Sequence, residues 1–336
     1  MKLSICIPTF NRRDKLPNCL NSIYIASKKT NIDFEVCISD NGSDYNVDDI
    51  VNKFNDKFKI KVNKNKSNIG YMSNLIKVIS LSESEFVWAI GDDDLLMPHS
   101  LVRLEEIFSK NTDVDFFFIN SFHLDYKHVD SFDSPFDTKN LPKNMDIKLG
   151  KKKDSQKLSF WELIDYNISF DFLVGNFLNV FKRKMWEDNL GCLDKDLIAD
   201  TRTWSNFDNT CGPTKVYANA FKKSKAYFCA EGLTVNCHGV REWSKLYPFI
   251  EIIRLPEILD YYRKNGLDFK RYIINKNYAL RNFSNYLFKI IILGRSGGIN
   301  YINFYRHICL NLVYPNVYLS IIYLIFRKIK KIFNFK

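Results

Sequence analysis

The chain lacks several features that define common protein classes. Its eight cysteines include no C-x-x-C pair and are scattered, which argues against a zinc site and against a disulfide framework. No G-x-G-x-x-G follows the first apolar segment and no G-x-x-x-x-G-K-S/T occurs, so dinucleotide-binding and P-loop folds are disfavoured. The apolar run at the amino terminus is too short for a signal peptide. We therefore expect a cytoplasmic protein in a reducing compartment.

Acidic residues are almost missing from the last quarter of the chain. Residues 261–336 contain fourteen Lys or Arg and one acid, Asp268, which gives this segment a net charge of +13. The whole chain has a net charge of +11, so residues 1–260 sum to −2. This asymmetry indicates a polyanionic partner, either an anionic membrane surface or nucleic acid.

The first third of the chain alternates apolar segments with amphipathic ones. Strands are predicted at residues 3–7, 34–39, 59–62 and 86–90, with helical periodicity between them. This order predicts an α/β fold, a Rossmann-like, mainly parallel sheet flanked by helices. A helix from Pro98 to about Lys110 and a strand at residues 114–120 are expected next.

The remainder of the chain is less regular. Residues 125–155 are polar and predict a long loop, a candidate mobile lid over a site. From Pro248 onward the composition predicts apolar, aromatic-rich helices. Before that point the patterns predict helices at residues 156–168, 182–189 and 214–223, and short strands at 226–230 and 233–237.

Three consecutive carboxylates, Asp92, Asp93 and Asp94, follow the fourth predicted strand. Their mutual repulsion would raise their pKa values unless a cation lies among them, and carboxylate oxygens suit Mg²⁺ or Mn²⁺. One interpretation is therefore a metal–diphosphate site at the carboxyl end of a strand, where open α/β sheets bind ligands. The other is an acidic loop that caps a helix starting near Pro98.

Several short motifs follow one another along the first third of the chain, at residues 4–12, 38–43 and 68–70, with Asn74, residues 92–94 and Pro98. Together, and in this order, they resemble glycosyltransferase family 2, which has the GT-A fold. The form Trp-x-x-Gly-Asp-Asp-Asp is similar to the branch of abequosyltransferase-like O-antigen sugar transferases. The resemblance implies an inverting hexosyl- or deoxyhexosyltransferase that uses Mn²⁺ or Mg²⁺ to move a sugar from a nucleotide-diphosphate donor.

The resemblance also implies roles for individual residues. Asp92 and Asp94, a D-x-D pair, would bind the metal, with Asp93 as a further metal candidate. Gly91 stands where the family motif has its first Asp, which leaves the ribose-contacting role to Asp92. His238 and Arg241 would face the diphosphate; the alternative for His238 is a purely structural role. Trp243 would either stack on a sugar ring or fill the core. The remaining residues expected to bind the nucleotide-sugar are Pro8, Thr9, Asn11, Arg12, Asp40, Asn68, Gly70, Asn74 and Asp93.

A general base is expected in the second half of the chain. The aligned stretch favours Asp200, with Asp208 as the second candidate and Asp194 and Asp196 as further options. Each of these carboxylates has the alternative of being a solvated loop residue or a helix cap.

The resemblance places a catalytic domain over residues 1–245, with a nucleotide-binding half at 1–120 and an acceptor half at 121–245. Residues 246–336 are expected to form a helical basic region. Residues 317–336 combine an apolar run with cations, which favours contact with the inner face of the cell membrane over a buried terminal helix.

We therefore expect an enzyme that acts on a lipid-linked oligosaccharide or a growing polysaccharide of O-antigen or capsule type. The alternatives are a basic α/β module that binds nucleic acid, or a transferase-like protein without activity. We favour the enzyme and expect no nucleic-acid partner, because the carboxylates after the fourth strand would repel phosphate groups unless a metal were bound.

Overall fold

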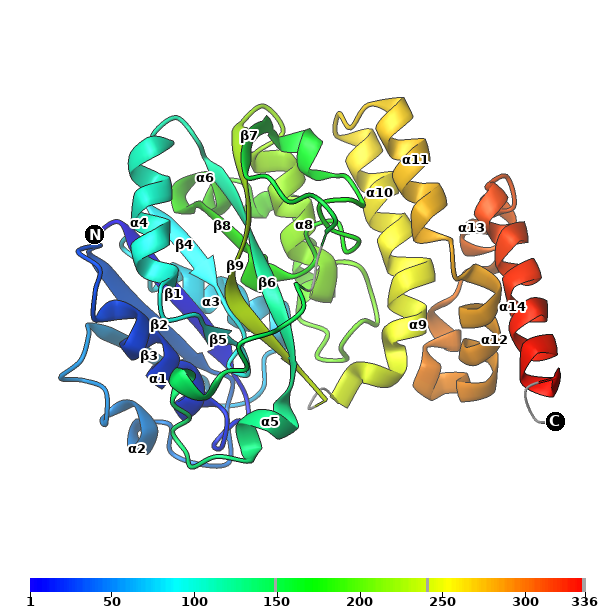
Figure 1. Ribbon diagram of the computed structural model, residues 1–336. Coiled ribbons are helices and arrows are strands. Elements are labelled where there is room, and N and C mark those ends of the chain that lie inside the picture. The colour runs from blue at the N-terminus through cyan, green and yellow to red at the C-terminus, as the bar shows by residue number, and fades with distance from the viewer. Residues whose placement is uncertain (148–149, 240–241, 334–336) are drawn as a thin grey trace.

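The computed structural model describes residues 1–147, 150–239 and 242–333, without the side chains of Glu242 and residues 327–333. A sheet with helices on both faces forms one side of the molecule (Figure 1). The carboxyl-terminal helices extend away from this sheet one after another, and the last of them, α14, is outermost.

The described residues form nine strands in one sheet, in the order β3-β2-β1-β4-β8-β6-β9-β5, with β7 paired to β9. The strands are β1 (Leu3–Thr9), β2 (Phe34–Asp40), β3 (Ile60–Lys64), β4 (Phe86–Ala89), β5 (Leu95–Leu96), β6 (Phe116–Asp125), β7 (Gln156–Ser159), β8 (Asn179–Lys182) and β9 (Lys225–His238).

The helices alternate with the strands in the first third and follow one another in the last. They are α1 (Leu16–Ser27), α2 (Asp48–Val51), α3 (Tyr71–Ser80), α4 (Ser100–Lys110), α5 (Tyr126–Asp130), α6 (Arg183–Glu187), α7 (Lys195–Ile198), α8 (Asp208–Ala220), α9 (Tyr247–Phe249), α10 (Leu255–Lys264), α11 (Phe269–Ala279), α12 (Phe283–Leu293), α13 (Phe304–His307) and α14 (Pro315–Phe333).

The parallel sheet predicted for the first third is confirmed. β1 pairs in parallel with β2 and β4, and β2 pairs in parallel with β3. Side chains alternate between the two faces, as the strand period requires. Leu3, Ile5 and Ile7 pack with α1, α2 and α4, whereas Cys6 packs with α3 on the other face.

The sheet also contains antiparallel strands. β8 runs antiparallel between β4 and β6, and the two-residue strand β5 pairs antiparallel with β9. The predicted strands at 226–230 and 233–237 are one strand, because β9 continues through an irregularity in its pairing with β6 near Asn120 and Gly232. This continuity carries the end of β9 to the same edge of the sheet as the end of β4.

One further prediction was wrong, and another holds only in part. The expected helix at residues 156–168 is strand β7 followed by a 3-10 helix, Phe160–Leu163, because β9 offers residues 156–159 a strand to pair with. Residues 125–155 are not simply a polar loop, since Tyr126, Val129 and Phe136 are buried together in a small core at the edge of the sheet.

The largest core joins the sheet to the helical region. Phe116 and Phe181 from the sheet lie in the same buried cluster as Ile258 and Tyr262 of α10. The hydrophobic core therefore continues across the domain boundary expected at residue 245.

Candidate active site

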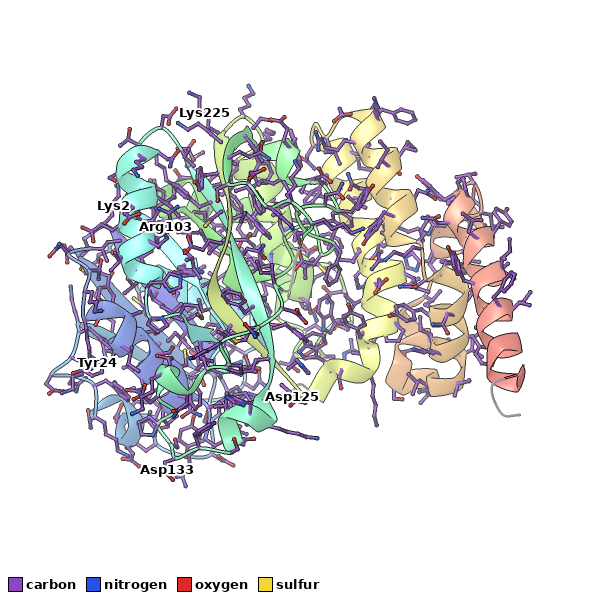
Figure 2. All side chains as sticks on the ribbon, viewed as in Figure 1. Lys2, Tyr24, Arg103, Asp125, Asp133 and Lys225 are labelled. Carbon is purple, nitrogen blue, oxygen red and sulfur yellow. The ribbon has the colours of Figure 1, made fainter. Side chains whose placement is uncertain are left out.

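The loops at the carboxyl ends of the parallel strands contain most of the polar residues selected from the sequence. Figure 2 marks this edge by Asp125, the last residue of β6, whereas Lys225 at the start of β9 lies at the opposite edge. The chain order of strands and helices explains the clustering, because parallel strands all end at one edge.

Asp40 ends β2 and is held by the turn that follows. Its carboxylate accepts hydrogen bonds from the backbone N–H of Ser43 at 3.2 Å and from the Ser43 hydroxyl at 2.5 Å. The Ser43 hydroxyl oxygen accepts a hydrogen bond from the N–H of Asn11 at 2.8 Å, and the Asn11 side chain accepts one from the N–H of Asp44 at 3.0 Å. Asn11 has a φ of 53°, a conformation that Asn tolerates better than most residues. The loops after β1 and β2 therefore form one unit.

A second set of amides joins the end of β2 to the start of α3. Asn41 Nδ2 donates to Asn68 Oδ1 at 3.0 Å, and the same oxygen accepts from the N–H of Gly70 at 2.8 Å. Asn74 donates to the carbonyl of Ser39 at 2.9 Å and accepts from the Ser39 hydroxyl at 2.7 Å. Asn74 is buried, and its hydrogen bonds to Ser39 hold α3 against β2.

Asp94 is fixed by a strand that is distant in the sequence. Its Oδ1 accepts hydrogen bonds from Asn236 Nδ2 at 2.8 Å and from the N–H of Cys237 at 3.3 Å, both on β9. The next two residues of the chain form β5, which pairs with the same strand. The turn after β4 is thereby held rigidly against β9.

Asp92 is buried in this turn, with 8% of its surface exposed. Burial and the charge of Asp93 raise the pKa of Asp92 to about 7, and the Thr9 hydroxyl and the Arg12 guanidinium oppose this rise. Arg12 Nε lies 3.7 Å from Asp92 Oδ1. The rise comes first from the burial of the carboxyl group and second from the neighbouring negative charge, both of which disfavour the ionised form.

Gly91 stands directly before the three carboxylates. A Cβ atom at this position would lie 2.8 Å from Asp93 Oδ1 and 2.8 Å from Asp94 Oδ2, closer than real Cβ contacts come. Both oxygens therefore occupy the space that a side chain at position 91 would need. The glycine lets the two carboxylates converge.

This arrangement fits a hard divalent cation such as Mn²⁺ or Mg²⁺. Among the described residues, no group of three or more His, Cys, Asp or Glu side chains is arranged to hold a metal ion. Mg²⁺ is commonly held by one or two carboxylates together with oxygens of a bound phosphate compound. Asp92 and Asp94, the residues expected to bind the metal, have the donor chemistry for an ion whose shell the substrate would complete.

His238 ends β9 at the same edge. Its ring stacks on the ring of His123 from β6, with centroids 4.1 Å apart and planes 13° from parallel. It follows Asn236, the partner of Asp94, by two residues. Trp243 packs against Trp204 at 5.6 Å between ring centroids, and Arg241 lies outside the described residues.

The loop after α7 brings Asp200 to the start of α3. A Cβ atom at Gly70 would lie 3.4 Å from the carbonyl oxygens of both Ile198 and Asp200. The Ser73 hydroxyl donates to the carbonyl of Ile198 at 3.1 Å. Asp200 therefore lies beside Gly70, a residue expected near the nucleotide.

The Asp200 carboxylate is tightly bound within its own loop. Arg202 donates to both of its oxygens, at 2.9 and 2.8 Å, and the Ser205 hydroxyl donates at 2.6 Å. The hydrogen bonds from Arg202 hold the pKa of Asp200 well below its usual range. The group is therefore ionised at neutral pH, in the form that accepts a proton.

The other candidate carboxylates have different surroundings. Asp208 is buried at the start of α8, where Lys215 Nζ lies 2.7 Å from Oδ2 and the N–H of Asp194 donates to the same oxygen at 2.9 Å. Asp194 itself caps α7, accepting from the N–H groups of Asp196 and Leu197. Asp196 is exposed.

Two residues that contact the candidate site were not selected from the sequence. Asn236 stands between apolar residues in a segment predicted as a strand. A polar amide at such a position was the sequence feature that could have marked it, and the structure shows that it is buried. Arg202 is only two positions from Asp200, but nothing in the sequence distinguishes it from a solvated cation.

Comparison with known proteins identifies the first half of the chain. Residues 4–154 match the family model of glycosyl transferase family 2. Over 116 residues, 34% of this chain and 34% of the relative, the sequence is 35% identical to abequosyltransferase RfbV of Salmonella typhimurium. It is 26% identical over 116 residues to an uncharacterized glycosyltransferase of Haemophilus influenzae, of which 37% is covered. The match thus spans about a third of each relative.

Solved structures extend the likeness over most of the chain. S. aureus TarS 1–349 in complex with UDP has a TM-score of 0.58 at 16% identity, over 84% of this chain and 72% of that one. The mannosyltransferase PcManGT from Pyrobaculum calidifontis, in complex with GDP-Man and Mn²⁺, has a TM-score of 0.52 at 14% identity, over 100% of this chain and 88% of that one. At these identities the likeness shows the fold. The chain therefore contains a glycosyltransferase family 2 domain, matched over residues 4–154, and has the GT-A fold.

Proposed function

We propose that this protein transfers a sugar from a nucleotide-diphosphate donor to a hydroxyl of a lipid-linked oligosaccharide or growing polysaccharide, of O-antigen or capsule type. The observation that carries the proposal is the buried carboxylate cluster at the carboxyl edge of the sheet, within a family 2 domain. A related protein is named an abequosyltransferase, and structures of the same fold hold UDP or GDP-Man.

The donor nucleotide would lie over the ends of β1 and β2. Asp40 would accept a hydrogen bond from the base, and its fixed position against Ser43, which in turn bonds Asn11, supports this role. Pro8, Thr9 and Asn11 would lie beneath the base. Asn68 and Gly70 would contact the nucleotide, and Asn74 would hold α3 in place.

The diphosphate would lie over the end of β4. Asp92 and Asp94 would hold Mn²⁺ or Mg²⁺, which when bound neutralises the charge that develops on the leaving diphosphate. Arg12 and His238 are donors at the same edge and would hydrogen-bond phosphate oxygens. Gly91 would let the carboxylates of Asp93 and Asp94 keep these positions beside the diphosphate.

Asp200 is the proposed general base, and it would take the proton from the acceptor hydroxyl. Its position beside Gly70 supports this role over Asp208, whose carboxylate is buried against Lys215. Attack by the acceptor on the face opposite the leaving diphosphate would invert the anomeric carbon. The acceptor's lipid would be met at the inner face of the cell membrane.

A nucleotide screen tests the proposal. The thermal midpoint of the purified chain would be measured with UDP, GDP, CDP and dTDP, each with and without Mn²⁺. A ligand that binds only the native state raises the midpoint by mass action, so one nucleotide should stand out and should require the ion.

Asp94→Asn is the matched variant, because it removes the charge and keeps an oxygen that can accept from Asn236 and Cys237. The variant should fold and lose the Mn²⁺-dependent shift. If no nucleotide raises the midpoint and the chain is retained on RNA instead, the binding-module alternative replaces the transferase.

A further inference from the structure

The outer helices carry apolar side chains that the described part of the chain leaves uncovered. We define the outer face by six side chains with 67–77% of their surface exposed, one from α12, three from α13 and the turn after it, and two from α14. They are Ile292, Phe304, Tyr305, Val313, Tyr323 and Phe326. Single exposed apolar residues are ordinary, but a contiguous apolar surface on a soluble protein marks an interaction site.

α14 packs against the protein through a narrow stripe. Val317 and Ser320 are buried, and the Ser320 hydroxyl bonds the Ser284 hydroxyl of α12 at 2.8 Å. Other positions on the helix, including Ile322 and Tyr323, are exposed and apolar. A surface helix usually presents polar residues to water, so this helix has a second apolar side that residues 1–147, 150–239 and 242–326 leave uncovered.

α13 and α14 meet at a sharp bend. The segments Phe304–Asn311 and Pro315–Phe326 lie at 86° to each other, and Val313 stands at the bend with 77% of its surface exposed. In the described chain no single helix has the length and apolar character of a membrane span, although this bent pair meets that test together. Exposed apolar side chains occur on both sides of the bend, among them Phe304 before it and Tyr323 after it.

The charge of this region identifies the partner. Residues 269–336 contain no Asp or Glu and twelve Lys or Arg, and Lys289 and Arg295 are exposed close to the apolar residues of α12. A second copy of the chain would bring the same positive charges against one another. An anionic lipid surface matches both properties, because it accepts apolar and aromatic side chains and attracts cations.

We propose that the outer face of α12, α13 and α14 binds an anionic lipid bilayer. The proposal rests on the proposed function, in which the acceptor is met at the membrane. It assigns lipid binding to side chains of three helices and not to the carboxyl-terminal segment alone. In Figure 1 the carboxyl-terminal end of α14 points to the same side of the molecule as the ends of β6 and β9. Binding at this face would keep the chain at the membrane that carries a lipid-linked acceptor.

The experiment is cosedimentation of the full chain with vesicles of phosphatidylcholine alone and of phosphatidylcholine mixed with phosphatidylglycerol. The chain should bind the mixed vesicles, more weakly as salt is added. Two double variants separate a tail from a surface: Ile322→Asn with Phe326→Asn on α14, and Ile292→Asn with Phe304→Asn outside it. Each should weaken binding ~10-fold or more, because each removes two apolar side chains that would be transferred from water into the bilayer.

Phe132→Asn, at an exposed aromatic of the sheet domain, is the control and should bind normally. The nucleotide-induced rise in thermal midpoint is measured on the same proteins, so failure of the donor site is distinguished from failure of the lipid surface. The proposal is overturned if the wild-type chain ignores the mixed vesicles, or if the α12–α13 variant binds as well as wild type. It is also overturned if the variants abolish a dimer instead.

Discussion

Asp92 is the residue at which stability and the proposed function oppose each other. Its pKa is raised from 3.8 to about 7, chiefly by burial. Between these two values the folded chain keeps a proton that the unfolded chain has released. Stability therefore falls as pH rises through this window, and the ionised group costs the metal-free fold at most about 4 kcal/mol above it.

We expect Asp92→Asn to raise the thermal midpoint of the metal-free protein at about pH 8, because the amide has no charge to desolvate. The difference from wild type should shrink as the pH is lowered toward about 3, where Asp92 is largely protonated in both states. Thermal melts in a chelator across this range measure it. A variant less stable than wild type at pH 8 would mean that the carboxylate is compensated in the free protein.

Asp200 and Asp208 should respond differently to the same change. We expect Asp200→Asn to lower turnover by ~10²–10⁴-fold, the usual contribution of a general base, with donor affinity nearly unchanged. Asp208→Asn should mainly lower stability, because it leaves Lys215 without its buried partner. Transfer kinetics and nucleotide titration on both variants separate the two roles. Full activity of Asp200→Asn would move the base to another carboxylate.

At the scale of elements, the loop that carries Asp200 is held by a helix of the carboxyl-terminal region. Arg254, just before α10, is buried and donates to the carbonyl oxygens of Trp204 and Ser205 at 2.9 and 3.1 Å. Its other partner is Glu257 at 2.5 Å, which also contacts His307 of α13 at 3.0 Å. The helical region therefore shapes the candidate catalytic loop.

Arg254→Met should lower the free energy of unfolding by ~3 kcal/mol or more, because it leaves a buried carboxylate and two carbonyls with fewer partners. Arg103→Met, which breaks a half-exposed pair with Glu106 and Glu231, should cost ~1 kcal/mol or less. Denaturant melts of the two variants provide the comparison, and Figure 2 labels Arg103 on the sheet domain, away from α10. If both variants lost the same free energy of unfolding, the hydrogen bonds of Arg254 would contribute no more to stability than a surface ion pair.

The errors of prediction also lie at this scale. β1 to β4 follow from local patterns, because each strand and helix is short and continuous in the sequence. β7 and β9 do not, because residues 156–159 become a strand only when β9 lies beside them. Pairing between distant segments overrides local preference, which is why the second half was predicted less well.

At the scale of the whole molecule, the helical region shares its core with the sheet but adds α14 at the outside. A chain that ends after Pro315 loses the buried Val317 and the bonds of Ser320 to α12. Its core between the sheet and α10 remains intact.

We expect this truncated chain to melt at a lower temperature, by an amount consistent with losing ~1.5–3 kcal/mol for a buried Val. It should keep its nucleotide-dependent stabilisation and part of its vesicle binding, since Ile292 and Phe304 are still present. Melts with nucleotide and vesicle cosedimentation measure both. Complete loss of lipid binding would assign the contact to residues 316–336 alone.

The sequence by itself determined the parallel half of the sheet, the position of Asp92–Asp94 at a strand end and the basic character of the last quarter. These properties depend on residues that are close together in the chain. Only the tertiary structure decided that Asp94 is held by Asn236, 142 residues away, and that Asp200 lies beside Gly70. The reason is physical: a side chain's pKa, its hydrogen-bond partners and its exposure depend on neighbours in space, and the folding of distant segments brings those neighbours together.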